Sequence, residues 1–164
     1  MLDFLFHKSN KREDVRRVLH GRVNRAHAQA VSVASARGAT RGAFTEVVWI
    51  VPCASPDAAN FTNVYPAITK DLSTSGMAII HSACIQEPCV IVGLKDGADR
   101  RFLACTPKHC TSLGYGFFLI GMIADEVLTL RPGDIDTMTQ TMAKREAAAQ
   151  IPAAANGKGV PAKV

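Results

Sequence analysis

A short polar motif carries the strongest chemical signal in the sequence. It has the pattern D-x-S-x-x-G, formed by Asp71, Ser73 and Gly76, and it falls between two segments rich in β-branched residues. In an extended chain, residues i and i+2 project to the same side, so the Asp71 carboxylate and the Ser73 hydroxyl can face one ligand. The carboxylate accepts paired N–H donors, and Gly76 allows a close approach or a positive φ. The same pattern also fits a structural turn that caps a hairpin.

Two arginines at R-x-x-x-R spacing, Arg37 and Arg41, precede this motif in a glycine-containing segment. Each guanidinium is a planar fork that can bind a phosphate or the O6/N7 edge of guanine, and its face can stack on a base. Arg12 and Arg16 have the same spacing, but they lie in a predicted helix and farther from Asp71, so we rank them second.

Six short segments rich in β-branched or aromatic residues predict the strands that would position these side chains. Turn residues separate the segments, among them Asp96-Gly97 and the stretch 107–114. Because no helical pattern intervenes, the segments indicate an all-β core, either a barrel or a sandwich. The predicted strands are 43–51, 63–71, 76–82, 88–95, 100–106 and 115–124.

Helical patterns flank the β segments on both sides. Residues 10–35 predict a helix that Asn10 caps, with five arginines around an apolar stripe, which is typical of a solvated basic face. The stripe consists of Val15, Val18, Leu19, Val23, Ala26 and Ala30. A second helix is predicted over 134–150, starting at Asp134. Since the segment 115–124 is apolar on both faces, we expect this second helix to cover its outer face.

Composition limits the class of protein. The chain has 164 residues, of which 48% are hydrophobic and 20% charged, so it is long and apolar enough to bury one core. No apolar run approaches the roughly 18 to 20 residues that cross a bilayer. The apolar start, residues 1–6, contains Asp3 and precedes the basic stretch, which is the reverse of a secretory signal. We therefore expect a cytoplasmic protein without a membrane span.

The five cysteines are Cys53, Cys84, Cys89, Cys105 and Cys110. An odd number in a chain without an export signal argues against a disulfide framework, so reduced thiols are expected. His81, Cys84 and Cys89 could in principle meet Cys105, His109 and Cys110 across a hairpin and bind zinc. However, no C-x-x-C pair is present, and Cys89 and Cys105 lie in apolar segments, so we expect no metal site.

Taken together, the two motifs, their order and their β context resemble the PilZ domain family, bacterial receptors for the second messenger cyclic di-GMP. The segment 114–121 is similar to the family's final strand, and 134–150 to its C-terminal helix. In place of the basic or proline residues that often flank the family's first motif, this chain has Gly38, Ala39, Thr40 and Gly42. The resemblance divides the chain into a basic helical extension (1–36), a PilZ-like domain (37–150) and a flexible tail (151–164).

The resemblance implies a six-stranded antiparallel β-barrel that binds cyclic di-GMP. The implied ligand-binding residues are Arg37, Arg41, Asp71, Ser73 and Gly76. No other cofactor is implied. Ligand capture by the arginine segment would reorient the N-terminal helix and signal to a downstream protein partner.

Three other functions are weighed against this one. A PilZ-like barrel can serve as a protein-interaction scaffold without binding a nucleotide. A nucleic-acid-binding module is the second, since the first 41 residues hold nine lysines and arginines against three acids. Its stacking aromatics would be grouped with the arginines, whereas here they are scattered, which argues against nucleic acid. The third is an enzyme, and no nucleophile-elbow, P-loop or H-E-x-x-H motif occurs, so we expect no catalytic residues.

Overall fold

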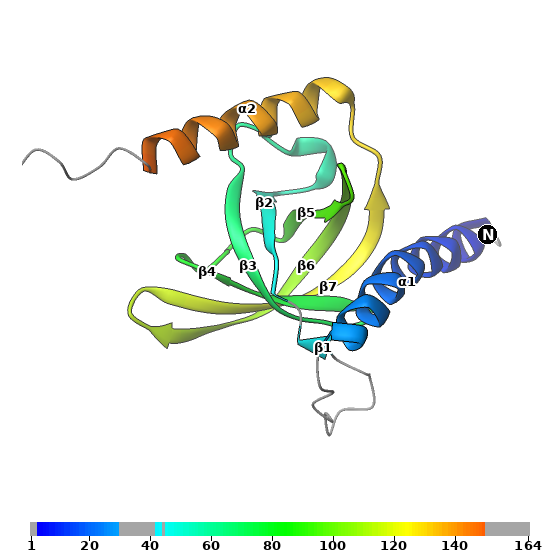
Figure 1. The fold of residues 1–164 in the computed structure, drawn as a ribbon. Coiled ribbons are helices and arrows are strands. Elements are labelled where there is room, and N and C mark those ends of the chain that lie inside the picture. Colours follow the sequence, from blue (N-terminus) through cyan, green and yellow to red (C-terminus); the bar gives the residue numbers. More distant parts are fainter. Residues whose placement is uncertain (1–2, 30–41, 44, 150–164) are drawn as a thin grey trace, which may run out of the picture.

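Six antiparallel strands close into a barrel in a computed structural model, which describes residues 3–29, 42–43 and 45–149 (Figure 1). The strands pair in the order β3-β2-β5-β6-β7-β4, and β4 pairs again with β3 to close the ring. The predicted six-stranded antiparallel barrel is therefore confirmed. Its strands are β2 (Val47–Cys53), β3 (Tyr65–Leu72), β4 (Gly76–His81), β5 (Cys89–Asp96), β6 (Asp99–Gly114) and β7 (Phe117–Leu128).

Four smaller or flanking elements complete the described chain. The helix α1 (Asp3–Gln29) precedes the barrel and the helix α2 (Pro132–Ala149) follows it, as predicted. A two-residue strand, β1 (Gly42–Ala43), pairs with the end of β3, and a short 3-10 helix, η1 (Pro56–Ala58), lies between β2 and β3. None of the helices in this part of the chain is long and apolar enough to cross a membrane.

The barrel interior is filled by alternate residues of the six strands, because successive side chains of a strand point to opposite faces of the sheet. Side chains on the other face of each strand point outward, and many of these are polar or small. The inward-facing core includes Val48, Ile50, Leu72, Ile79, Val92, Leu103 and Ile120.

The hairpin of β6 and β7 is longer than predicted. The stretch 107–114, expected to be a separator, continues β6, and its residues pair with β7 as far as Gly114 and Phe117. The turn lies instead at Gly114, Tyr115 and Gly116, all of which have positive φ. Gly114 and Gly116 adopt this left-handed backbone conformation without steric cost. Pro107 does not end β6 and is tolerated inside the strand.

The N-terminal helix is part of the core. α1 runs beside β7, and Val15, Leu19 and Val23 are buried in the same cluster as the inward-facing barrel residues (Figure 1). The predicted stripe is thus confirmed for these residues. The predicted start is wrong, because Asn10 lies inside the helix and does not cap it. Residues 3–9 contain no proline or glycine, so nothing in them stops the helix from beginning earlier.

The C-terminal helix packs elsewhere than expected. Met138 of α2 is buried in a second cluster with Val51, Ile91 and Phe102, on strands β2, β5 and β6. The outer face of β7 is not covered by it, since Phe117 is 51% exposed and Ile123 44%. The chain leaves β7 at Leu128 and crosses to the neighbouring strands (Figure 1). The expectation that this helix would cover the last strand is therefore wrong.

Candidate functional site

The serine of the D-x-S-x-x-G motif stabilises the turn between β3 and β4. The backbone N–H of Ser73 donates to the carbonyl oxygen of Gly76 at 2.9 Å, and its hydroxyl donates to the same oxygen at 3.1 Å. The Ser73 hydroxyl also accepts from the N–H of Ser75 at 3.4 Å. These bonds hold a tight turn, and Ser73 is only 6% exposed. The outer surface of the turn is therefore formed by the residues next to Ser73.

The glycine of the motif is required by close packing of two strands. A Cβ atom on Gly76 would lie 2.2 Å from the carbonyl oxygen of Met122 on β7. Among the described glycines, positive φ occurs at Gly97, Gly114 and Gly116, so the backbone of Gly76 does not need glycine's conformational freedom. The structure therefore gives Gly76 the task of letting β7 approach β4.

We expect Gly76→Ala to lower the free energy of unfolding by about 1–3 kcal/mol, because the clashing atom belongs to the backbone and cannot rotate away. Urea unfolding followed by circular dichroism measures this change. Gly121→Ala is the control, since its Cβ would meet the ring of His109, an exposed side chain that can turn aside. Equal losses in the two variants would contradict the backbone explanation.

Asp71 lies at a junction of three strands. It pairs with Ala43 of β1 on one side and with Ala78 of β4 on the other, and its side chain is half-buried. The pairing of β3 with β4 shifts register between Thr69 and Asp71, so a bulge there re-aims the side chains that follow. Asp71 and Ser73 both line one cavity.

The two motif arginines, Arg37 and Arg41, lie outside the described residues. The chain that directly follows Arg41 is described, and it pairs with β3 at the D-x-S-x-x-G motif: Gly42 is the partner of Leu72, and Ala43 is the partner of Asp71. The strand register thus brings Gly42 and Ala43 beside the start of the second motif, although Ala43 and Asp71 are far apart in the sequence.

A cavity of about 420 Å³ lies on the outer face of the barrel beside these residues. Its floor includes Ala78 and Gly121, and Leu119 and Ile123 flank it. Three basic side chains line it that the motif search missed: Lys70, Lys108 and His109. Lys70 is adjacent to Asp71 in sequence, but the other two reach the cavity only through the pairing of β6 with β7, which no local pattern reveals.

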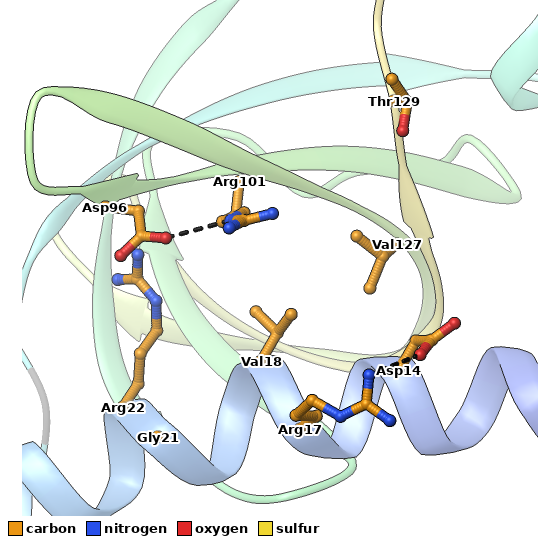
Figure 2. A pocket seen from close by; sticks show the side chains of 9 residues that line it. All are labelled: Asp14, Arg17, Val18, Gly21, Arg22, Asp96, Arg101, Val127 and Thr129. Carbon is orange, nitrogen blue, oxygen red and sulfur yellow. Dashed lines mark hydrogen bonds and ion pairs between the residues drawn. The ribbon is translucent and has the colours of Figure 1, made fainter.

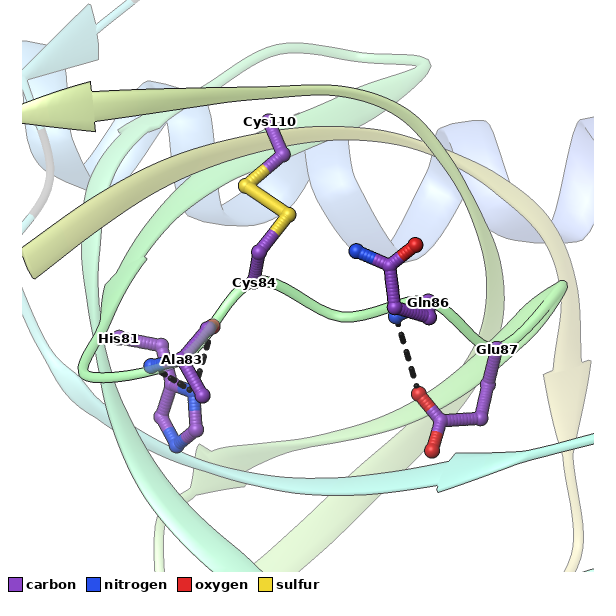
Figure 3. Close-up of a disulfide and its surroundings, with 6 residues drawn as sticks. All are labelled: His81, Ala83, Cys84, Gln86, Glu87 and Cys110. Carbon is purple, nitrogen blue, oxygen red and sulfur yellow. Dashed lines mark hydrogen bonds between the residues drawn. A yellow bond between two sulfur atoms is a disulfide. The ribbon is translucent and has the colours of Figure 1, made fainter.

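The cysteines differ from the expectation of five reduced thiols. Cys84, in the loop between β4 and β5, forms a disulfide with Cys110 of β6, with their Cα atoms 6.1 Å apart (Figure 3). The expectation rested on the odd number of cysteines, a count that does not exclude a single pair, and the long β6 carries Cys110 past that loop. Cys110 directly follows His109, so the disulfide joins the loop after β4 to the part of β6 that lines the cavity.

The other three cysteines are free and embedded in the sheet. Burial raises the pKa of the Cys53 thiol to about 12, and it also raises the pKa values of Cys89 and Cys105. Such thiols stay protonated at neutral pH and behave as small apolar side chains. Within the described part of the chain, no group of three or more histidine, cysteine or acidic side chains is arranged to hold a metal ion.

The basic face of α1 is only partly solvated. Arg12, Arg16 and Arg17 are exposed, but Arg22 is 4% exposed and faces the barrel. Its Nη1 donates to Oε2 of Glu46 at 3.1 Å, and its Nη2 donates to the carbonyl oxygen of Lys95. The expectation of a solvated face is therefore wrong at Arg22, because an acid just before β2 lies within its reach.

A second cavity, of about 560 Å³, separates α1 from the strands beside Arg22 (Figure 2). Its charged side chains are largely matched to one another: Arg17 donates to Asp14 at 3.2 Å, and Arg101 to Asp96 at 3.0 Å. Arg17 and Arg101 of this cavity therefore each have a carboxylate partner.

Comparison with known proteins returns little. No family model and no curated protein matches the chain. A solved structure of the Bacillus subtilis inhibitor of motility, MotI/DgrA, resembles it with a TM-score of 0.40 and 13% sequence identity. The match covers 71% of this chain but only 54% of the solved one, so the chain spans about half the length of that protein. The barrel is defined by its own strand pairing.

Proposed function

We propose that this protein binds cyclic di-GMP on the outer face of its barrel and signals to a partner protein through α1. The proposal combines the sequence resemblance to PilZ receptors with one observation that carries it, the pairing of β1 with β3. Gly42, the residue that follows the R-x-x-x-R motif in the sequence, pairs with Leu72, and Ala43 pairs with Asp71, which supports a site shared by the two motifs.

The chemistry of these residues suits a cyclic dinucleotide. An arginine fork pairs with a phosphate or with guanine O6 and N7, and it also stacks on the base. The carboxylate of Asp71 is an acceptor for the paired N–H groups on a guanine edge. Ser73 and Gly76 serve this site indirectly, by fixing the turn and the strand spacing that present Asp71.

Glu46 links the proposed site to α1. Its backbone N–H donates to the Thr69 hydroxyl at 2.8 Å, and its carbonyl oxygen accepts from the Thr69 N–H at 2.9 Å. The carboxylate of the same residue holds Arg22 of α1. Since Thr69 is two residues before Asp71, a ligand that shifts β1 or the end of β3 would strain the contact that holds the helix.

Calorimetric titration with cyclic di-GMP tests the proposal. We expect the wild type to bind, and Arg41→Ala to weaken binding about 5- to 150-fold, the value of a bidentate arginine contact to guanine. The double variant Arg12→Ala/Arg16→Ala is a matched control, because it removes two arginines at the same spacing from an exposed helix face. It should bind like the wild type.

Two results would overturn the proposal. The first is a folded wild type that releases no heat and shows no binding. The remaining functions to test would then be a protein-interaction scaffold and nucleic-acid binding by the basic N-terminal arm. Equal weakening by the Arg12/Arg16 and Arg41 variants would indicate attraction by net charge alone, since that attraction does not depend on which arginines are removed.

A further inference from the structure

A straight line of paired residues crosses four strands on the outer face of the barrel. Asp71 of β3 pairs with Ala78 of β4, Ala78 pairs with Gly121 of β7, and Gly121 pairs with His109 of β6. Neighbouring strands lie about 4.8 Å apart, so the line is about 14 Å long. It has polar side chains at both ends and the smallest side chains in the middle.

The small residues make the middle of this line a shallow groove, the cavity already described beside Asp71. Leu119 and Ile123, outward neighbours of Gly121 along β7, form its apolar sides. The imidazole of His109 lies across Gly121, where a Cβ atom would be 2.0 Å from its Cε1. The groove thus has apolar sides and an exposed aromatic ring that lies over Gly121 in its floor.

Two lysines give the groove a positive potential. Lys70 precedes Asp71 at one end, and Lys108 precedes His109 at the other, and both are exposed. Among the described residues, neither lysine forms an ion pair with an acid. Asp71 is the one acidic side chain among the described residues that line the cavity. A groove of this kind favours a ligand that combines planar rings with negative charge.

We propose that Lys108 and His109 form the second wall of the cyclic di-GMP site, opposite the Asp71 turn. His109 stacks on a guanine, and Lys108 binds a phosphate. This inference rests on the proposed function and goes beyond it, because it places part of the ligand contact on β6, far from both sequence motifs. The disulfide at Cys110 fixes this part of β6 to the loop after β4.

The test compares His109→Ala, His109→Phe and Lys108→Ala with the wild type in calorimetric titrations with cyclic di-GMP. His109→Ala removes the base stacking and should weaken binding about 5- to 150-fold. His109→Phe keeps an aromatic face and should retain most of the affinity. Lys108→Ala should weaken binding about two- to fivefold, as expected for an exposed charge. Lys144→Ala, an exposed lysine of α2, removes the same charge at a distant place and should bind like the wild type.

The outcomes separate this inference from the proposed function. If the wild type binds, Arg41→Ala weakens binding, and both His109→Ala and Lys108→Ala match the wild type, the second wall is overturned while the proposed function stands. Equal weakening by His109→Ala and His109→Phe would exclude stacking. If the wild type does not bind, both proposals fail. Because both side chains are exposed, unchanged melting temperatures are expected and show that the variants are folded.

Discussion

Leu19→Ala is expected to lower the free energy of unfolding by about 2–5 kcal/mol, the range for removing a fully buried leucine from a packed core. Leu19 is 0% exposed although it lies in the N-terminal helix, and the cluster that contains it also contains inward-facing residues of the barrel. The loss should therefore affect the whole domain, because no other described helix supplies side chains to this cluster.

Urea unfolding followed by the fluorescence of Trp49 measures the effect, since Trp49 is the only tryptophan and lies on β2 of the barrel. Arg16→Ala is the control, because Arg16 is exposed on the same helix and its loss should change stability by no more than about 0.5 kcal/mol. If α1 were a detachable extension, Leu19→Ala would leave the Trp49 transition at the wild-type urea concentration. That outcome would contradict the packing described above.

The strands were predictable because each contains a short run rich in β-branched or aromatic residues between turn residues, and that pattern is local. β6 was predicted only as far as residue 106 because its second half is exposed and polar, so it carries no such pattern. Its stability comes from pairing with β7, and Pro107 and Gly114 suggested a turn where the chain continues as a strand. Pairing between strands is a non-local property, and composition does not encode it.

The candidate site was predictable to the same limited extent. Asp71, Ser73 and Gly76 lie within six residues of one another, so their type and spacing identified them. The structure assigns Ser73 to hydrogen bonds of the β3–β4 turn and Gly76 to close packing against β7, which the motif alone could not distinguish from ligand contacts. Lys108 and His109 reach the cavity only because their strand was longer than predicted, whereas the disulfide at Cys110 was missed because an odd number of cysteines does not exclude a single pair.

The burial of Arg22 is a third feature that the sequence did not predict, and replacing Arg22 is expected to have the second large effect on stability. The apolar stripe of α1 was visible in the sequence, but the burial of an arginine beside it depends on Glu46, twenty-four residues later. We expect Arg22→Met to lower the free energy of unfolding by about 2–4 kcal/mol, because it leaves the Glu46 carboxylate without its main cation. This loss of stability is smaller than that expected for breaking a fully buried ion pair, because the Glu46 side chain is 21% exposed.

A double-mutant cycle with Glu46→Gln separates the ion pair from packing. Methionine keeps the aliphatic stem of Arg22, so the double variant should be more stable than the sum of the two single losses predicts. Additive losses would show that the pair does not hold the helix. Arg22→Lys should not rescue stability, because an ammonium cannot reproduce the guanidinium fork that reaches both Glu46 and the Lys95 carbonyl.

The Arg22→Met variant also tests the proposed coupling between ligand binding and α1. If Glu46 couples the ligand site to α1, cyclic di-GMP should bind Arg22→Met with an affinity different from that for the wild type, since the helix no longer resists a shift of Glu46 and Thr69. By linkage, the ligand must then change the strength with which α1 is held by the same factor. An unchanged affinity in a folded Arg22→Met variant would exclude Arg22 from the coupling and direct the search for the output to another surface of the barrel.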